Sequence, residues 1–255
     1  MNETSNEPSV RVEVDGLTKT YGKKVVLDSV SLSVAPHEVV CLIGSSGTGK
    51  STLLKCINNL VPFDSGTIKL DGVSTEDPQF GKRELYKRIG IVFQAYNLFP
   101  HMSVLDNITL APRRVHRRGR ETSEQDAHSL LSLFGLDGFA ASYPEQLSSG
   151  QQQRVAIIRA LANRPEVLLL DEVTAALDPE LIGDVLSVIR DLKDRGMTML
   201  IVTHEMGFAR DVADRVCFLD GGRILEDSPP QKLFTHPEHP RTRQFLQRII
   251  EAGRL

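Results

Sequence analysis

Residues 44–51 combine glycines, hydroxyl residues and a lysine in a spacing that suits phosphate binding. The segment follows the apolar run 39–43 and is a complete G-x-x-x-x-G-K-[ST] pattern, made of Gly44, Ser45, Ser46, Gly47, Thr48, Gly49, Lys50 and Ser51. Glycines let the backbone turn its N–H groups toward an anion, and a helix that includes Thr52 would point its positive end at the same place. Lys50 can reach the β and γ phosphates, and the Ser51 hydroxyl suits Mg²⁺, which prefers oxygen ligands. Residues 44–52 therefore predict a nucleotide site.

A second candidate for chemistry is the acidic pair Asp171 and Glu172, which ends the apolar run 167–170. In α/β sheets the carboxyl ends of strands present the ligand-facing groups. Asp171 there could hold Mg²⁺ through water, while Glu172 could polarise an attacking water molecule. Alone, the pair could be two solvated carboxylates at a strand end. Together with residues 44–52 it predicts nucleotide hydrolysis.

Two hydrophobic patterns predict the strands that hold these residues. Residues 10–14 and 30–34 alternate apolar and polar side chains, which is typical of half-buried antiparallel strands. Residues 39–43, 167–170 and 199–202 are continuous apolar runs, which suit central strands of a parallel sheet. We expect an α/β fold with a mostly parallel sheet, helices on both of its faces and an antiparallel β subdomain.

The middle of the chain, about residues 95–160, has a largely helical pattern. Residues 130–134 end at Gly135, a helix stop, and residues 151–162 are good helix formers. Near the end, several prolines precede an amphipathic stretch at 241–250, which predicts a docking helix. We predict one domain over residues 1–255, in which 1–94 and 160–228 form the core with its β subdomain, 95–159 a helical subdomain and 229–255 a C-terminal helical tail.

Composition narrows the class of protein. The 255 residues are enough to bury a sizeable core. No run approaches about 20 consecutive apolar residues, so we expect no membrane span. The polar first residues are not typical of a signal peptide, so we expect none. The three cysteines lack CxxC spacing and predict neither a disulfide framework nor a zinc site. A net charge of −3 gives no overall attraction to nucleic acid. The basic cluster at 113–120 is either a solvated face or a patch toward anionic lipid.

Residues 147–153, Leu-Ser-Ser-Gly-Gln-Gln-Gln, decide among nucleotide-binding proteins. They resemble the LSGGQ signature of the ATP-binding-cassette family, and the resemblance continues through 153–161 and the acidic strand to residues 176–178. A Ser-Gly turn at a helix start supplies N–H groups, a hydroxyl and a dipole for a γ-phosphate. Ser149 departs from the family pattern, which usually has glycine there. Its Cβ could restrict the local backbone angles or keep the phosphate from approaching the backbone as closely as at a glycine.

The resemblance implies roles for individual positions. Tyr21 matches the aromatic residue that stacks on adenine, and Gln94 matches the glutamine that touches Mg²⁺ and the attacking water. His204 matches the histidine that contacts the γ-phosphate, so the implied catalytic residues are Glu172, His204 and Gln94, and the implied metal ligands are Ser51, Gln94 and Asp171. Ser148, Ser149, Gly150 and Gln151 would face the ATP of a partner subunit, and Asp178 would lie in the loop that crosses to that partner. ATP and Mg²⁺ are the implied cofactors.

The resemblance also implies partners. The segment 143–146 before the signature resembles importers rather than exporters. A closer resemblance, to the ATP-binding subunits of bacterial polar amino acid importers of the glutamine and histidine type, is found at 93–102, 104–112, 171–174, 203–210 and 237–245. This implies a homodimer of cassettes, bound peripherally to membrane permease subunits at the cytoplasmic face of the inner membrane, and indirectly served by a substrate-binding protein. The segment 94–102 should help form the groove that receives a short permease helix. No nucleic acid partner is expected.

Two other function classes stay open from the sequence. One is a cytosolic cassette ATPase of DNA repair or translation, which would normally carry a coiled-coil insertion, a second cassette or a strongly basic face. The other is a regulatory module with a vestigial site, against which the presence of Lys50, Asp171, Glu172 and His204 argues.

Overall fold

The computed structural model describes residues 11–78, 80–251 and 253, and its strands form two sheets. The six-stranded sheet has the order β10-β9-β3-β8-β7-β6. Its strands are β3 (Val39–Ile43), β6 (Ile89–Val92), β7 (Val167–Asp171), β8 (Thr198–Val202), β9 (Arg215–Asp220) and β10 (Arg223–Ser228). All its neighbours pair in parallel except β10, which pairs with β9 in antiparallel. This confirms the predicted α/β fold and the buried strands at 39–43, 167–170 and 199–202.

The second sheet is antiparallel, with the order β2-β1-β4-β5. Its strands are β1 (Val12–Tyr21), β2 (Lys24–Val34), β4 (Ser65–Leu70) and β5 (Val73–Ser74). The alternation at 10–14 predicts only the beginning of β1, and Val10 lies outside the described residues. The strand continues beyond the alternating segment. The pairing register with β2 shifts between Val14 and Leu17, at Gly16 with φ of 58°, and this irregularity breaks the period of two.

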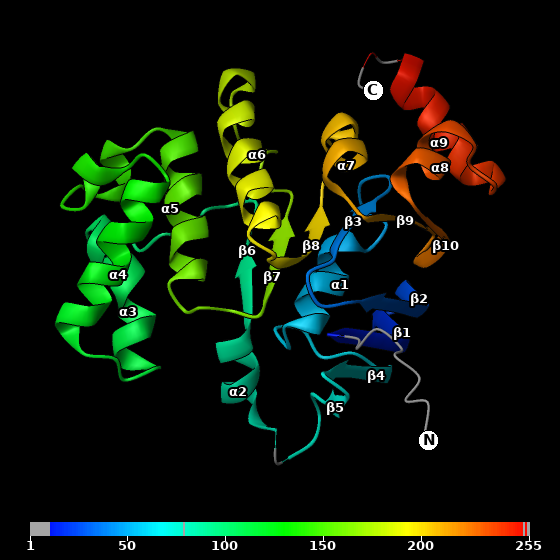
Figure 1. Cartoon of the computed structure of the whole chain (residues 1–255). Helices are drawn as coiled ribbons and strands as arrows, with labels where there is room; N and C mark the ends of the chain where they lie inside the picture. Colours follow the sequence, from blue (N-terminus) through cyan, green and yellow to red (C-terminus); the bar gives the residue numbers. More distant parts are fainter. Residues whose placement is uncertain (1–10, 79, 252, 254–255) are drawn as a thin grey trace, which may run out of the picture.

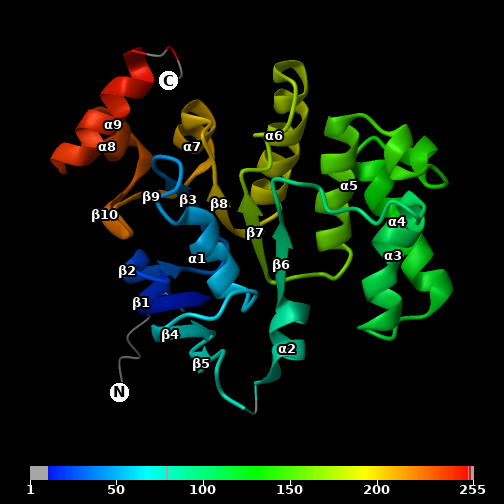
Figure 2. The same cartoon turned by 180° about the vertical axis from the view of Figure 1, so that it is seen from behind.

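The helices fall into three groups. Helix α1 (Lys50–Ile57) lies between the two sheets, and α2 (Gly81–Arg88) leads into β6 (Figure 1). Helices α3 (Val104–Arg114), α4 (Arg120–Leu133) and α5 (Ser149–Leu161) stand together at one side of the sheet in both views (Figure 2). The others are α6 (Pro179–Asp194), α7 (Met206–Val212), α8 (Pro230–Thr235) and α9 (Pro240–Glu251), with short 3₁₀ turns at Asp137–Phe139 and Pro144–Gln146.

These elements bear out the helical pattern of the middle section. The helix predicted at 151–162 begins two residues earlier, at Ser149, because Ser148 caps it. The predicted boundary between residues 159 and 160 falls inside α5, and the division into subdomains stays a prediction. The predicted docking helix is α9, whose Phe245 ring centroid lies 5.1 Å from that of Phe218 on β9. Residues 252, 254 and 255 of the predicted tail, like 1–10 of the predicted core, lie outside the described residues.

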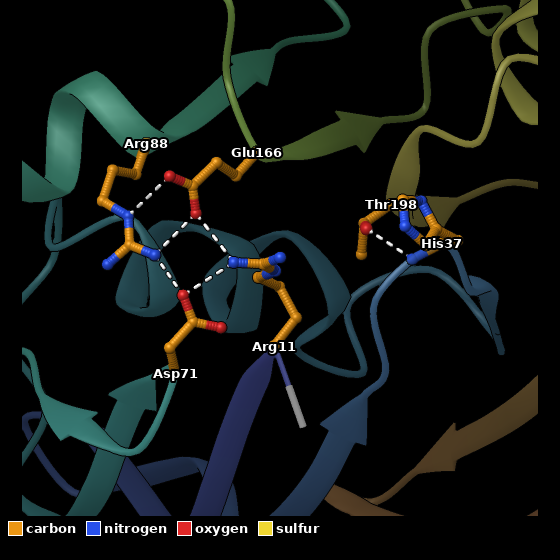
Figure 3. Close-up of polar contacts among 6 residues, drawn as sticks. All are labelled: Arg11, His37, Asp71, Arg88, Glu166 and Thr198. Carbon is orange, nitrogen blue, oxygen red and sulfur yellow. Dashed lines mark hydrogen bonds and ion pairs between the residues drawn. The ribbon is translucent and has the colours of Figure 1, made fainter. Parts of the chain in front are cut away.

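An ion network joins the two sheets at the amino end of the parallel strands (Figure 3). Arg11, just before β1, donates to Asp71 at 2.7 Å and to Glu166 at 2.9 Å. Arg88, at the end of α2, donates from Nε to Glu166 at 3.0 Å and also pairs with Asp71. The network fixes the two sheets to each other at the edge opposite the loop 44–49. This matters for the loop because it packs against a strand of each sheet. Among the described residues, no helix is long and apolar enough to cross a membrane.

Candidate functional site

The loop 44–49 leaves the carboxyl end of buried strand β3 and leads directly into α1. Gly44 has φ of 149° and Gly49 has φ of 107°. A Cβ on Gly44 would lie 2.1 Å from the carbonyl oxygen of Leu219, and one on Gly49 would lie 2.7 Å from that of Val26. Both positions therefore require glycine, and the loop is held between β9 and β2 in a form that turns into a helix amino terminus, the favoured place for a phosphate.

Lys50 folds back into this loop. Its Nζ donates to the carbonyl oxygens of Gly44 at 2.9 Å and Ser45 at 3.0 Å, and it lies 3.8 Å from Oε1 of Glu172. The side chain is buried, and this burial lowers the pKa of the ammonium, an effect that the nearby Glu172 and Asp171 oppose. The nearby carboxylates neutralise the buried ammonium only in part, and it lies at the start of a helix. Such a cation is suited to bind the oxygens of a polyphosphate.

Ser51 and Asp171 meet across the sheet edge. The Ser51 hydroxyl donates to Oδ1 of Asp171 at 2.7 Å, and Asp171 is only 5% exposed. Burial raises the pKa of Asp171, while the hydrogen bond from Ser51 lowers it. A hydroxyl and a carboxylate at contact distance are hard oxygen donors, so this pair fits Mg²⁺, which usually takes one or two carboxylates together with phosphate oxygens.

Gln94 follows the strand next to that of Asp171. It is exposed, two residues beyond β6, and β6 is the parallel neighbour of β7, with Val92 opposite Leu170. Its amide therefore leaves the same sheet edge as Asp171. Its assignment as a metal ligand and catalytic group stays a prediction.

Glu172 and His204 form the polar pair beside Lys50. Nε2 of His204 lies 2.9 Å from Oε1 of Glu172. Glu172 has φ of 48°, an unusual value for a residue with a Cβ, and its N–H donates to the carbonyl oxygen of Val202 at 3.0 Å. Because β7 and β8 pair with Asp171 opposite Val202, the residues just beyond the two strands face each other. The carboxylate is thereby aimed at the loop 44–49, where it can accept a proton from water.

Tyr21 lies at the end of β1; the residue is 51% exposed, and Nζ of Lys19 lies 5.1 Å from the centroid of its ring. The hairpin that Tyr21 closes runs on into Val26 and Leu27, which lie against Gly49. An exposed aromatic ring on this hairpin could stack on a base. That Tyr21 binds adenine stays a prediction.

The segment 148–151 forms the start of α5. The Ser148 hydroxyl accepts a hydrogen bond from the N–H of Gln151 at 3.3 Å, and the Gln151 side chain accepts one from the N–H of Ser148 at 2.9 Å. Ser149, the departure from the family pattern, is the first helical residue and is not among those with positive φ. Its Cβ therefore strains no backbone angle. Gly150 is buried, and a Cβ there would lie 3.2 Å from the side chain of Leu181.

The structure thus brings together Lys50, Ser51, Asp171, Glu172 and His204, but it does not bring α5 to them. In both views β6 and β7 stand between α5 and α1 (Figures 1 and 2). Asp178, exposed at the start of α6, is also outside the cluster. That residues 148–151 bind the ATP of a partner subunit stays a prediction.

Arg159 is a positioning residue that the motifs did not reveal. From α5 it donates to the carbonyl oxygens of Asn97 at 2.6 Å and Tyr96 at 3.0 Å, and its guanidinium lies 5.8 Å from the Phe99 ring centroid. The Tyr96 hydroxyl in turn donates to the carbonyl oxygen of Ala176 at 3.2 Å. The sequence signal was an arginine placed between the buried residues Ile158 and Ala160 of α5. It joins the signature helix to the segment after Gln94.

Comparison with known proteins agrees with this geometry. The family model described as ABC transporter matches residues 27–175. The glutamine transport ATP-binding protein of Geobacillus stearothermophilus is 50% identical over 234 residues, which cover 92% of this chain and 97% of that protein. The L-cystine transport system ATP-binding protein of Escherichia coli is 49% identical over 245 residues, covering 94% of this chain and 98% of that protein.

A solved structure gives the same fold. It is a dimeric ATP-binding cassette in a post-hydrolysis state, bound to ADP and Pi, with a TM-score of 0.78 and 34% sequence identity, and the match covers 86% of this chain and 98% of that one. The fold and the site therefore define a P-loop ATPase that uses ATP and Mg²⁺. This chain belongs to the ABC transporter family.

Proposed function

We propose that this chain is the ATP-hydrolysing subunit of an importer of polar amino acids. The observation that carries the proposal is the cluster of Lys50, Ser51, Asp171, Glu172 and His204 at one sheet edge, in a chain whose near-full-length relatives are transport ATP-binding proteins. Those relatives are named for glutamine, cystine, arginine and glutamate/aspartate, so polar amino acids are the shared substrate class. The chain would act at the cytoplasmic face of the membrane with a separate permease and a substrate-binding protein.

The geometry of the cluster supports a role for each residue. Mg²⁺·ATP supplies the phosphoanhydride bond whose hydrolysis releases free energy. The N–H groups of residues 44–50 and the ammonium of Lys50 bind and orient phosphate oxygens, and Ser51 with Asp171 would hold the Mg²⁺. Glu172 accepts a proton from water at Oε1, and His204 orients that carboxylate through its 2.9 Å contact. Gln94, two residues beyond β6, would complete the set.

Two copies of the chain are needed because one chain covers ATP from one side only. The Ser148 cap and the first N–H groups of α5 would bind the γ-phosphate held by the other chain's loop, and Asp178 would lie at the same interface. ATP then joins the two copies, and separation of the γ-phosphate releases them.

Uptake measurements in cells test this function. Cells lacking the chain should lose uptake of one or more of labelled glutamine, arginine, glutamate and cystine, while uptake of labelled leucine stays normal. The wild-type chain should restore uptake, and a Glu172→Gln chain should not. Unchanged uptake of all four polar amino acids would exclude this substrate class without bearing on the ATPase assignment.

A further inference from the structure

A basic pocket lies between α2 and the connection from α3 to α4. Its lining residues are Arg83, Lys87, Val115, His116, Arg117 and Arg118. Arg83 and Lys87 are four residues apart and so share one face of α2, opposite the loop residues. Among the described residues that line it, none is acidic. Lys87 is two residues before β6, at the amino edge of the sheet, so the pocket is separate from the loop 44–49 at the carboxyl edge.

The pocket is held in shape by its own cations. Arg83 donates from Nη2 to the carbonyl oxygen of Val115 at 2.7 Å. Arg118 donates to the carbonyl oxygens of Ala162 at 2.9 Å and Asn163 at 3.4 Å. These partners are neutral, so they position the guanidinium groups without cancelling their charge.

Two carboxylates outside the lining pair with lining cations. Glu84 pairs with Lys87 at 3.0 Å on α2, and Asp126 lies 3.8 Å from Arg118. Partial burial lowers the pKa of His116, and the neighbouring Arg118, Lys87 and Arg83 lower it further. Repulsion of this kind is relieved when an anion binds. The chain as a whole carries a net charge of −3, so the concentration of cations here is a local feature.

We propose that this pocket binds a phosphate group, carried either by a free phosphate compound or by an anionic lipid headgroup. Guanidinium groups fixed by backbone carbonyls present the remaining N–H groups in a planar fork that matches phosphate oxygens, and Lys87 adds a mobile point charge. The proposal concerns residues outside the ATP site and does not depend on the substrate of transport.

The first test is a titration of the full chain with inorganic phosphate, followed by NMR of the His116 imidazole, against sodium chloride at equal ionic strength. A local reporter separates this pocket from phosphate binding in the loop 44–49. Phosphate should shift the His116 signal saturably and raise the pKa of the imidazole. Lys87→Gln with Arg117→Gln should weaken phosphate binding at least about fivefold, because two cations are lost. Arg113→Gln with Arg114→Gln, the matched control, removes equal charge from α3 outside this lining and should change it less than about twofold.

The second test distinguishes the two sources of phosphate. Sedimentation with vesicles of phosphatidylglycerol and of phosphatidylcholine is compared for the wild type and both double variants. Binding to phosphatidylglycerol that only the Lys87/Arg117 variant loses assigns the pocket to a lipid headgroup. Saturable phosphate binding without vesicle binding assigns it to a free phosphate compound. The proposal is overturned if neither ligand binds, or if the two double variants weaken binding equally, since the effect would then be one of general surface charge.

Discussion

Nε2 of His204 lies 2.9 Å from Oε1 of Glu172. Glu172 holds an unusual positive φ, so its side-chain direction depends on contacts such as this one. His204→Ala should therefore lower the rate of phosphate release at least about tenfold, since a general base out of position loses much of its contribution. ATP affinity should stay within a few-fold. His236→Ala, a change at an exposed histidine far along the chain, is the control. Wild-type turnover in His204→Ala would show that the contact does not serve catalysis.

The fold and much of the site were predictable because their signals are local. The apolar runs at 39–43, 167–170 and 199–202 are stable only when buried, as central strands of a parallel sheet. The loop 44–49, the acidic pair at 171–172 and His204 follow these runs closely in the sequence. The contact between Glu172 and His204 was not predictable from spacing, because it depends on the register of β7 against β8. Arg159 was missed for a similar reason: its partners are carbonyl oxygens, which leave no trace in side-chain patterns.

Lys50→Ala tests phosphate binding in the loop. It removes a buried ammonium that can make charge-assisted hydrogen bonds worth about 1.5–3 kcal/mol each, so ATP should bind about 10–100-fold more weakly. Nucleotide titration with a fluorescent ATP analogue measures the change, with Lys69→Ala on β4 as the control. Unchanged affinity would remove Lys50 from the binding site.

Asp171→Asn separates stability from metal binding. The raised pKa of Asp171 means that its protonated form stabilises the fold below the unfolded value of 3.8, and that this contribution is lost as the pH rises through the folded value. At pH 7.5 the free chain bears the buried charge, so Asn, which can still accept from Ser51, should raise the melting temperature by up to about 4 °C.

The rise in melting temperature of Asp171→Asn over the wild type should shrink as the pH is lowered toward about 4. In this variant, Mg²⁺ should no longer raise the melting temperature beyond the value measured with ATP alone. Thermal unfolding between about pH 4 and pH 8, with and without Mg²⁺ and ATP, measures both effects. A variant that is less stable at pH 7.5 and still responds to Mg²⁺ would contradict both roles.

Phe99 tests the surface for the permease. Leu98 and Tyr96 pack against the main core, whereas Phe99 is 40% exposed and is held by Arg159. A substitution at Leu98 would therefore disturb folding, and Phe99→Ala is the cleaner test. It should reduce transport at least about fivefold in the complete transporter, because it removes an apolar contact of about 1 kcal/mol. The ATPase rate of the isolated chain should not change. Leu133→Ala, an exposed apolar residue of α4, is the control, and equal loss of transport in both would place the contact elsewhere.

The most direct test of the central claim is gel filtration of Glu172→Gln beside the wild type, in Mg²⁺ and ATP, with phosphate release followed in parallel. The substitution removes the group that accepts a proton from water and relieves its repulsion of the phosphates, while Lys50, Ser51 and Asp171 still bind. The variant should bind ATP, release phosphate at least about 100-fold more slowly and elute as a dimer, whereas the wild type should return to the monomer after turnover. Phosphate release at the wild-type rate would contradict the role of Glu172, and with it the proposed mechanism.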